Sequence, residues 1–302
     1  MGLSAWRRPA ERLYFAPMRL AWFDENRLGV VRGERVHDVT GVLSELSISY
    51  PYPPGDPLIA NLEALRPKLE AAADTAEAKP AAEVSFHSPV ANPSKVIGTP
   101  ANYMKHVEEA EADPEIITER FQGKVEQQGL FLKANSSLVG PGDGIAVRFP
   151  ERRTDHELEL GVVIGRTAAE IEEAEALDYV AGYAIALDMS IRGPEDRSLR
   201  KSCDSYAVLG PWLVTADEIA DPDNLDFTLT IGGATRQGSN TRNMILDTRR
   251  QISWASRFYT LHPGDIIMTG TCEGVGPIAA GDVLNCRFQT IGEMDVAVRA
   301  AG

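Results

Sequence analysis

The chain has 302 residues and a formal net charge of −14, with 43% hydrophobic and 25% charged residues. This ordinary globular composition excludes disorder on a large scale, and the length suffices for one large domain with a small one. The acidic balance argues against a nucleic-acid partner and against docking on an anionic membrane, although a local cluster of arginine and lysine can still attract a small anion.

The cysteines and the N-terminus bear on the compartment. Three cysteines without CxxC spacing predict neither a disulfide framework nor a zinc site, so we expect a cytoplasmic protein. The sequence contains no apolar run of about 18 residues, so we predict no transmembrane helix. Residues 1–17 carry three arginines but lack the apolar core of a secretory signal, and we interpret them as an N-terminal extension.

Residues 18–90 are predicted to form a small N-terminal α+β domain. Short strands are expected from Met18 to Val36, and leucines spaced three and four apart predict an amphipathic helix over 57–73. The small, polar stretch AAADTAEAKPAAE that follows is interpreted as a linker, with a domain boundary near residues 86–93.

Residues 91–302 are expected to form a larger, strand-rich domain. Its runs of strand-forming residues are separated by turn sequences at Pro141–Gly144, Gly232-Gly233, Pro263–Asp265 and Gly281-Asp282. Capping-box patterns begin at Thr167 and Thr215 and predict a short helix and a brief turn, and a longer helix is expected over about 244–259. Because no βαβ alternation occurs, we predict a mixed β fold with some helices.

The segment DHELELGVVIGR gives the strongest indication of chemistry. Read as a strand over 154–164, it places Glu157 and Glu159 on one face. If buried, these two carboxylates need a cation between them. Asp188 ends another apolar run and offers a third carboxylate. Each feature alone is common on exposed strands or at strand ends, but together they predict a site for a hard cation such as Mg²⁺, Mn²⁺ or Ca²⁺.

A series of stretches between residues 95 and about 282 resembles the fumarylacetoacetate hydrolase superfamily, in the order NYMKHVEE, FLKANSSLVGPGD, DHELELGVVIG, VAGYAIALDMSIR, RKSCDSYAVLGPWLVTADEI, RQGSNTRNMI and LHPGDIIMTGTCEGVGP. As a set they are far more specific than any one motif. The resemblance implies a β-sandwich roll for the large domain, and a homodimer. It also implies that Glu157, Glu159 and Asp188 hold one divalent metal, which binds a 2-oxo acid substrate through its carboxylate and 2-oxo oxygens.

His106 precedes Glu109 by three residues, so a helix would place the two on neighbouring faces. From the residues alone, a surface histidine in an acidic helix is the favoured interpretation. The resemblance reverses that preference, because relatives with the same His-x-x-Glu pattern carry a lid dyad that activates water. It implies that His106 is a general base that Glu109 orients.

The resemblance also assigns roles to residues that would otherwise be ordinary surface groups. It implies that Lys201 stabilises a developing oxyanion and that Arg192 holds the substrate. Thr271 lies in a glycine-rich turn without the GxxxxGK[ST] pattern of a phosphate loop, and it matches a threonine that contacts substrate. Three further positions match the lining of the family's site: Tyr103, Lys133 and Ser136.

Some residues depart from the family pattern. Thr99 stands where fumarylacetoacetate hydrolases proper have a fourth metal carboxylate, so the chain looks more like the smaller acylpyruvate-type members. Glu195 stands where many relatives have glutamine. The stretch from Glu109 to Phe131 is longer and more acidic than usual, and a lid of different length leaves the substrate open.

The expected activity is metal-dependent hydrolysis of a C–C bond in an acylpyruvate-type 2-oxo acid. One alternative on the same scaffold is an isomerase, decarboxylase or hydratase of a 2-oxo-enoate diacid in aromatic catabolism, because some decarboxylating members carry the dyad too. The other is a metabolite-binding protein with an inactive site. The complete set of carboxylates, dyad and Lys201 disfavours the inactive protein.

Overall fold

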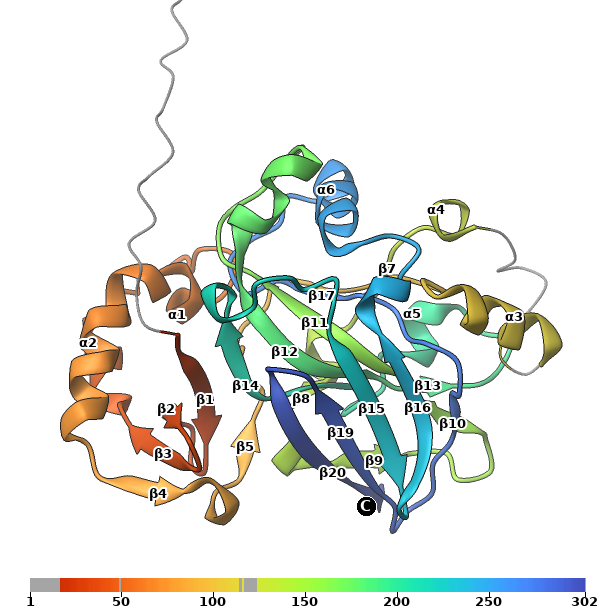
Figure 1. Cartoon of the computed structure of the whole chain (residues 1–302), viewed down its shortest axis with the longest axis horizontal. Coiled ribbons are helices and arrows are strands. Elements are labelled where there is room, and N and C mark those ends of the chain that lie inside the picture. The colour runs from red at the N-terminus through yellow and green to blue at the C-terminus, as the bar shows by residue number, and fades with distance from the viewer. Residues whose placement is uncertain (1–16, 49, 114–115, 117–123, 302) are drawn as a thin grey trace, which may run out of the picture.

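The computed structural model describes residues 17–48, 50–113, 116 and 124–301 (Figure 1). Most of the predicted extension 1–17, and residues 114–115 and 117–123 of the acidic stretch, lie outside this part. No helix in the described ranges is long and apolar enough to cross a membrane.

The N-terminal residues form the predicted strands and helix. The antiparallel strands are β1 (Arg19–Phe23), β2 (Arg27–Arg32) and β3 (Arg35–Asp38). The helical region divides at Asn61 into α1 (Pro57–Ala60) and α2 (Leu62–Thr75). The side chain of Asp56 accepts hydrogen bonds from the first turn of α1, which fixes where that helix begins.

The predicted linker is wrong, because much of it has regular structure. Its first residues complete α2, since alanine favours helix more than any other residue. Next comes β4 (Ala78–Pro80), which pairs with β3 at the edge of the sheet, where a proline is tolerated. A further strand, β5 (Phe86–His87), pairs with β1.

The N-terminal strands and the rest of the chain share one twelve-stranded sheet. Its main path runs β4-β3-β2-β1-β14-β12-β11-β17-β6-β7, and β1 pairs directly with β14. Besides those already given, its strands are β6 (Val96–Gly98), β7 (Phe131–Lys133), β8 (Leu138–Val139), β11 (Leu158–Ile164), β12 (Val180–Asp188), β14 (Ala207–Thr215) and β17 (Ile266–Met268). The division at residue 90 stays a prediction.

The central strands are buried on both faces. Leu160 of β11 and Ile185 of β12 pack in the core shared with the second sheet, whereas Val163 and Ala184 pack in the core shared with α1 and α2. Every residue of β11 is buried, which explains why it reads as a nearly continuous apolar run.

A five-stranded sheet lies across the large one, as Figure 1 shows for β15, β16, β19 and β20 over β11 and β12. Its strands are β9 (Ile145–Val147), β15 (Asp226–Ile231), β16 (Ala234–Asn240), β19 (Val283–Phe288) and β20 (Gly292–Ala300). A three-stranded sheet consists of β10 (Thr154–His156), β13 (Ser190–Ile191) and β18 (Gly276–Pro277). The predicted mixed β class with some helices is confirmed.

The remaining helices are short. They are α3 (Met104–Ala112), α4 (Val125–Gln128), α5 (Arg197–Arg200) and α6 (Thr248–Phe258). The helix predicted after Thr167 is wrong, because only a 3-10 helix forms, and it begins later. The 3-10 segments span Thr40–Glu45, Ala81–Glu83, Asn135–Ser137, Pro141–Asp143, Glu173–Tyr179, Ala216–Glu218 and Thr241–Asn243.

Candidate active site

Three carboxylates converge where β11 and β12 meet. Glu157 lies between β10 and β11, Glu159 is the second residue of β11, and Asp188 ends β12. The backbone N–H of Asp188 donates to the carbonyl of Glu157 at 2.9 Å, so the two residues lie opposite each other. One carboxylate oxygen from each residue lies within 4.8 Å of the others. The predicted convergence is confirmed.

These carboxylates are buried but unequally compensated. Burial acts to raise the pKa of Glu157, but Lys201 and Arg192 outweigh it and hold that pKa far below its usual value. The pKa of Glu159 is raised well above its usual value by burial and by the charges of Asp188 and Glu157. The backbone N–H of Gly270 donates to Glu159 at 2.7 Å, and no ion pair joins Glu159 to a described cation.

The donor set fits a hard divalent cation. Three buried, closely spaced carboxylate oxygens supply ligands of the kind that Mg²⁺ and Mn²⁺ prefer. The mutual repulsion that raises the pKa of Glu159 is what a bound cation would relieve. The residues that could hold the metal are therefore the predicted ones: Glu157, Glu159 and Asp188.

Two lysines bond different oxygens of Asp188. The ammonium of Lys201 donates to Glu157 at 2.6 Å and to Asp188 at 2.7 Å, and it faces the ring of Phe131. The ammonium of Lys133 bonds Asp188 and donates to the carbonyl of Tyr206 at 3.0 Å. The Lys133 side chain is fully buried. The structure therefore places Lys133 behind Asp188 as its counterion, although the sequence suggested a substrate contact.

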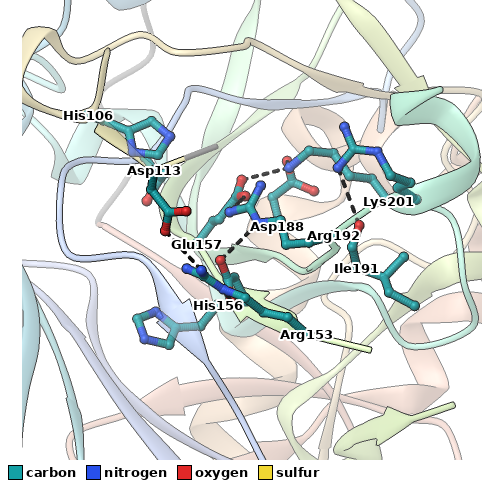
Figure 2. Close-up of polar contacts among 12 residues, drawn as sticks. His106, Asp113, Arg153, His156, Glu157, Asp188, Ile191, Arg192 and Lys201 are labelled. Carbon is teal, nitrogen blue, oxygen red and sulfur yellow. Dashed lines mark hydrogen bonds and ion pairs between the residues drawn. The ribbon is translucent and has the colours of Figure 1, made fainter. Parts of the chain in front are cut away.

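Arg192 is held between two acidic groups. Its Nε donates to Asp155 at 2.8 Å and its terminal nitrogen donates to Glu157 at 3.1 Å. Figure 2 shows Arg192 beside Glu157 and Asp188. Asp155 has no exposed surface, and it is a supporting residue that the sequence did not suggest. Arg192 thus fixes the orientation of Glu157 in addition to any contact with substrate.

The predicted dyad forms on α3. His106 Nδ1 and Glu109 Oε2 lie 2.9 Å apart, and the other oxygen of Glu109 accepts the backbone N–H of Gly274 at 2.9 Å. His106 is 7% exposed. Because Nδ1 faces Glu109, Nε2 is the nitrogen left to exchange a proton with a molecule in the cavity.

Carboxylates, the dyad histidine and cations line one cavity. The lining residues are Thr99, Pro100, Ala101, His106, Ala110, Ile116, Phe131, Glu157, Glu159, Asp188, Arg192, Arg197, Arg200, Lys201 and Thr271. Arg197 and Arg200 are additions that the sequence did not suggest.

Of three other predicted substrate contacts, Thr271, Tyr103 and Ser136, only Thr271 lines this cavity. Thr271 lines it, but its hydroxyl donates to the carbonyl of Leu158 at 2.9 Å and accepts from Gln237 at 2.7 Å. Tyr103 is buried beside Phe227 and is not part of the lining. Ser136 is exposed on a 3-10 helix away from the lining, so its predicted substrate contact has no support in this geometry.

The positions that depart from the family pattern have polar partners. The hydroxyl of Thr99 donates to Gln251 at 2.7 Å, so the place of a fourth carboxylate is taken by a neutral hydrogen bond. Glu195 forms an ion pair with Arg152 at 2.8 Å and does not line the cavity.

Comparisons with known proteins agree with this geometry. Residues 95–299 match the family model described as fumarylacetoacetate (FAA) hydrolase C-terminal. Maleylpyruvate hydrolase of Aquipseudomonas alcaligenes is 49% identical over 286 residues, which are 94% of this chain and 100% of that protein. Mitochondrial oxaloacetate tautomerase Fahd2a of Rattus norvegicus is 37% identical over 70% of this chain and 69% of its own length.

This chain is also similar to a solved structure over nearly its whole length. Maleylpyruvate hydrolase from Sphingobium sp. SYK-6, in complex with a manganese(II) ion and pyruvate, superposes with a TM-score of 0.79 at 38% identity, covering 94% of this chain and 100% of that one. The family match extends over most of the chain and includes all three converging carboxylates. The chain belongs to the fumarylacetoacetate hydrolase family.

Proposed function

We propose that this protein is a divalent-metal-dependent hydrolase that cleaves a C–C bond in an acylpyruvate-type 2-oxo acid. The observation that carries the proposal is a single cavity lined by three buried carboxylates, a histidine that faces a glutamate, and Lys201. The relative with 49% identity is a maleylpyruvate hydrolase, and the similar solved structure contains manganese and pyruvate.

Glu157, Glu159 and Asp188 would hold the metal. When bound, the metal supplies a Lewis acid for the carboxylate and 2-oxo oxygens of the substrate and favours negative charge on the pyruvate half. The cation would neutralise carboxylates that otherwise repel one another. Metal binding should therefore also stabilise the folded protein.

His106 is the proposed general base. Its Nε2 accepts a proton from water while the water oxygen bonds to the distal acyl carbonyl. The C–C bond then breaks, its electron pair stays with the pyruvate half as an enolate, and a proton from the histidine converts that half to pyruvate. The other product is a carboxylic acid. Glu109 positions the ring, because the backbone N–H of Gly274 holds the carboxylate in place.

Lys201 is the proposed donor to the oxyanion that forms when water attacks. Its ammonium has three N–H groups, and two of them bond Glu157 and Asp188. One donor remains for a substrate oxygen. Lys201 is 6% exposed and lines the cavity, so such a bond would form with little competition from water.

The test is an assay of acylpyruvates with Mg²⁺, with Mn²⁺ and after treatment with EDTA, with products identified. We expect pyruvate and a carboxylic acid in stoichiometric amounts, and loss of activity with EDTA that added metal restores. Activity that survives complete metal removal refutes the proposal. Enol–keto exchange without cleavage would instead support the activity named for the tautomerase relatives.

We further propose that the protein acts as a homodimer in the cytoplasm. Its described cysteines are free, and Cys272 and Cys286 are buried thiols, which fits a reducing compartment. Light scattering after size-exclusion chromatography tests the dimer, and a mass of one chain would refute it.

A further inference from the structure

A buried glutamine joins two segments beside the cavity. Gln237 lies on β16 and is 1% exposed. Its Nε2 donates to the hydroxyl of Thr271 at 2.7 Å and to the carbonyl of Cys272 at 3.0 Å. Its Oε1 accepts the backbone N–H of Leu158 at 3.0 Å. Thr271 lines the cavity and Gln237 does not, so Gln237 can affect a bound molecule only through its partners.

The two ends of the Gln237 amide cannot be exchanged. The backbone N–H of Leu158 needs an acceptor and the carbonyl of Cys272 needs a donor, so the amide oxygen must face Leu158 and the nitrogen must face Cys272. Nδ1 of His156 also lies 3.0 Å from the amide oxygen, and because that oxygen can only accept, this nitrogen donates to it. Gln237 is consequently a fixed donor to Thr271.

This donor determines the direction of the Thr271 hydroxyl. A threonine hydroxyl has one hydrogen and two acceptor sites. The hydrogen is donated to the carbonyl of Leu158 at 2.9 Å, and one acceptor site receives the N–H of Gln237. One acceptor site remains for a molecule in the cavity. Thr271 can therefore accept a hydrogen bond there, but it cannot donate one without losing its bond to Leu158.

Thr271 lies on a loop that contacts both parts of the site. The backbone N–H of Gly270 donates to Glu159 at 2.7 Å, and the backbone N–H of Gly274 donates to Glu109 at 2.9 Å. Gly274 has a φ of +91°, and a Cβ there would lie 2.0 Å from a carbonyl oxygen of β16, so glycine allows the loop to approach that strand. In the chain, Thr271 stands between a residue bonded to a predicted metal ligand and a residue bonded to the dyad.

We propose that Gln237 is a positioning residue that keeps Thr271 as a hydrogen-bond acceptor for the water molecule that attacks the substrate. This inference rests on the proposed function. Water has two hydrogens, of which His106 takes one during the attack while Thr271 accepts a hydrogen bond from the other. Together the two bonds orient the water oxygen toward the acyl carbonyl. The carboxylate and 2-oxo oxygens of the substrate have no hydrogen to donate, so Thr271 does not bind them.

The test separates orientation of water from binding of the anion. Thr271→Val removes the hydroxyl at nearly constant volume, and in the metal-loaded protein we expect kcat to fall about tenfold, the effect of one hydrogen bond. The inhibition constant of pyruvate, an anion without a hydrogen to donate to Thr271, should stay within about twofold of the wild-type value. Thr271→Ser keeps the hydroxyl and should retain most of kcat.

Gln237→Met removes the amide while keeping a similar size, and it should lower kcat by a similar factor. Because Gln237 acts through Thr271, the double variant Q237M/T271V should match T271V within about twofold in kcat, and the two losses should not multiply. Ser253→Ala is the control for a lost buried hydrogen bond. Ser253 is 1% exposed and its hydroxyl donates to the carbonyl of Ile171 at 2.8 Å, outside the cavity lining. This variant should lower Tm but leave kcat and the pyruvate constant unchanged.

A rise in the pyruvate constant of T271V that matches its loss of kcat would overturn the inference, because Thr271 would then hold the substrate anion. A normal kcat in Q237M, or losses that multiply in the double variant, would also overturn it, because Gln237 would then only support the fold. T271V and T271S keep the inference falsifiable even if Q237M does not fold. If the wild-type protein cleaves no acylpyruvate, the proposed function itself fails.

Discussion

Replacement of Glu159 by glutamine is expected to stabilise the metal-free protein while abolishing metal binding. Glu159 is 2% exposed and receives one backbone N–H, from Gly270, which the amide oxygen of glutamine can also accept. Burial and the charges of Asp188 and Glu157 disfavour the ionised form of Glu159, whereas glutamine is neutral without taking up a proton. We expect the free energy of unfolding without metal to rise by about 1–3 kcal/mol, the usual cost of an uncompensated buried polar group.

Asp188→Asn is the matched variant, and we expect it to lower the free energy of unfolding without metal. Asp188 pairs with both Lys133 and Lys201, so neutralising it leaves Lys133 buried without a counterion. Removing one partner of a buried ion pair costs about 3–5 kcal/mol. The two variants lose the same metal ligand charge, yet their metal-free stabilities should move in opposite directions.

Thermal unfolding in EDTA, followed by titration with Mn²⁺, measures both effects. At 100 times Kd a bound ion should stabilise the wild-type protein by about 2.7 kcal/mol, and both variants should lose most of that response. Since about 1 kcal/mol moves Tm by roughly 2–4 °C in a chain somewhat shorter than this one, the shifts are measurable. If E159Q and D188N destabilise the metal-free protein equally, the reasoning about charge compensation is wrong.

Further variants distinguish residues that act in the reaction from residues that stabilise the fold. His106→Gln should lower kcat by on the order of a hundredfold or more while the metal-induced rise in Tm persists; a normal kcat would exclude His106 as the base. Glu109→Gln should reduce kcat less, and calorimetry should show an intact fold. Lys133→Met should lower Tm in EDTA, whereas a higher KM at unchanged Tm would restore the substrate contact that the sequence suggested. Ser136→Ala should leave KM and kcat within about twofold, because this residue is exposed away from the cavity; a clear rise in KM would show that the site extends beyond the observed lining.

Part of the site could be predicted because strand geometry is local. The two-residue period of a strand places Glu157 and Glu159 on one face without knowledge of the rest of the fold. The position of Asp188 requires the register of β11 against β12, in which Glu157 and Asp188 are joined by a backbone hydrogen bond. The sequence alone does not state that register, and the family resemblance supplied it.

Contacts between distant segments could not be predicted. Lys133 meets Asp188, and Arg192 meets Asp155, across separations of 55 and 37 residues. Neither pairing leaves a periodic pattern in the chain. The positions of Arg197 and Arg200 could not be predicted either. Their helix, α5, has four residues, which is too short to show the apolar repeat that predicts a helix.

The error at the predicted linker has a different physical origin. Alanine-rich, charged sequence is compatible with both a helix end and an irregular connection, and its state depends on what it packs against. Here Ala73 is 1% exposed in the core shared by α2 and the large sheet, and β4 finds a partner in β3. Tertiary burial decided the conformation where propensity and turn residues pointed different ways.

The charge of the chain also shows why a global property does not decide a local one. A net charge of −14 repels an anion at long range, but at physiological ionic strength charges more than about 8 Å apart in solvent are largely screened. Arg192, Arg200 and Lys201 line the cavity and are buried, so solvent screens their fields much less. An approaching anion therefore meets weak repulsion outside and nearby cations inside the cavity, so the net charge of the chain does not exclude an acidic substrate.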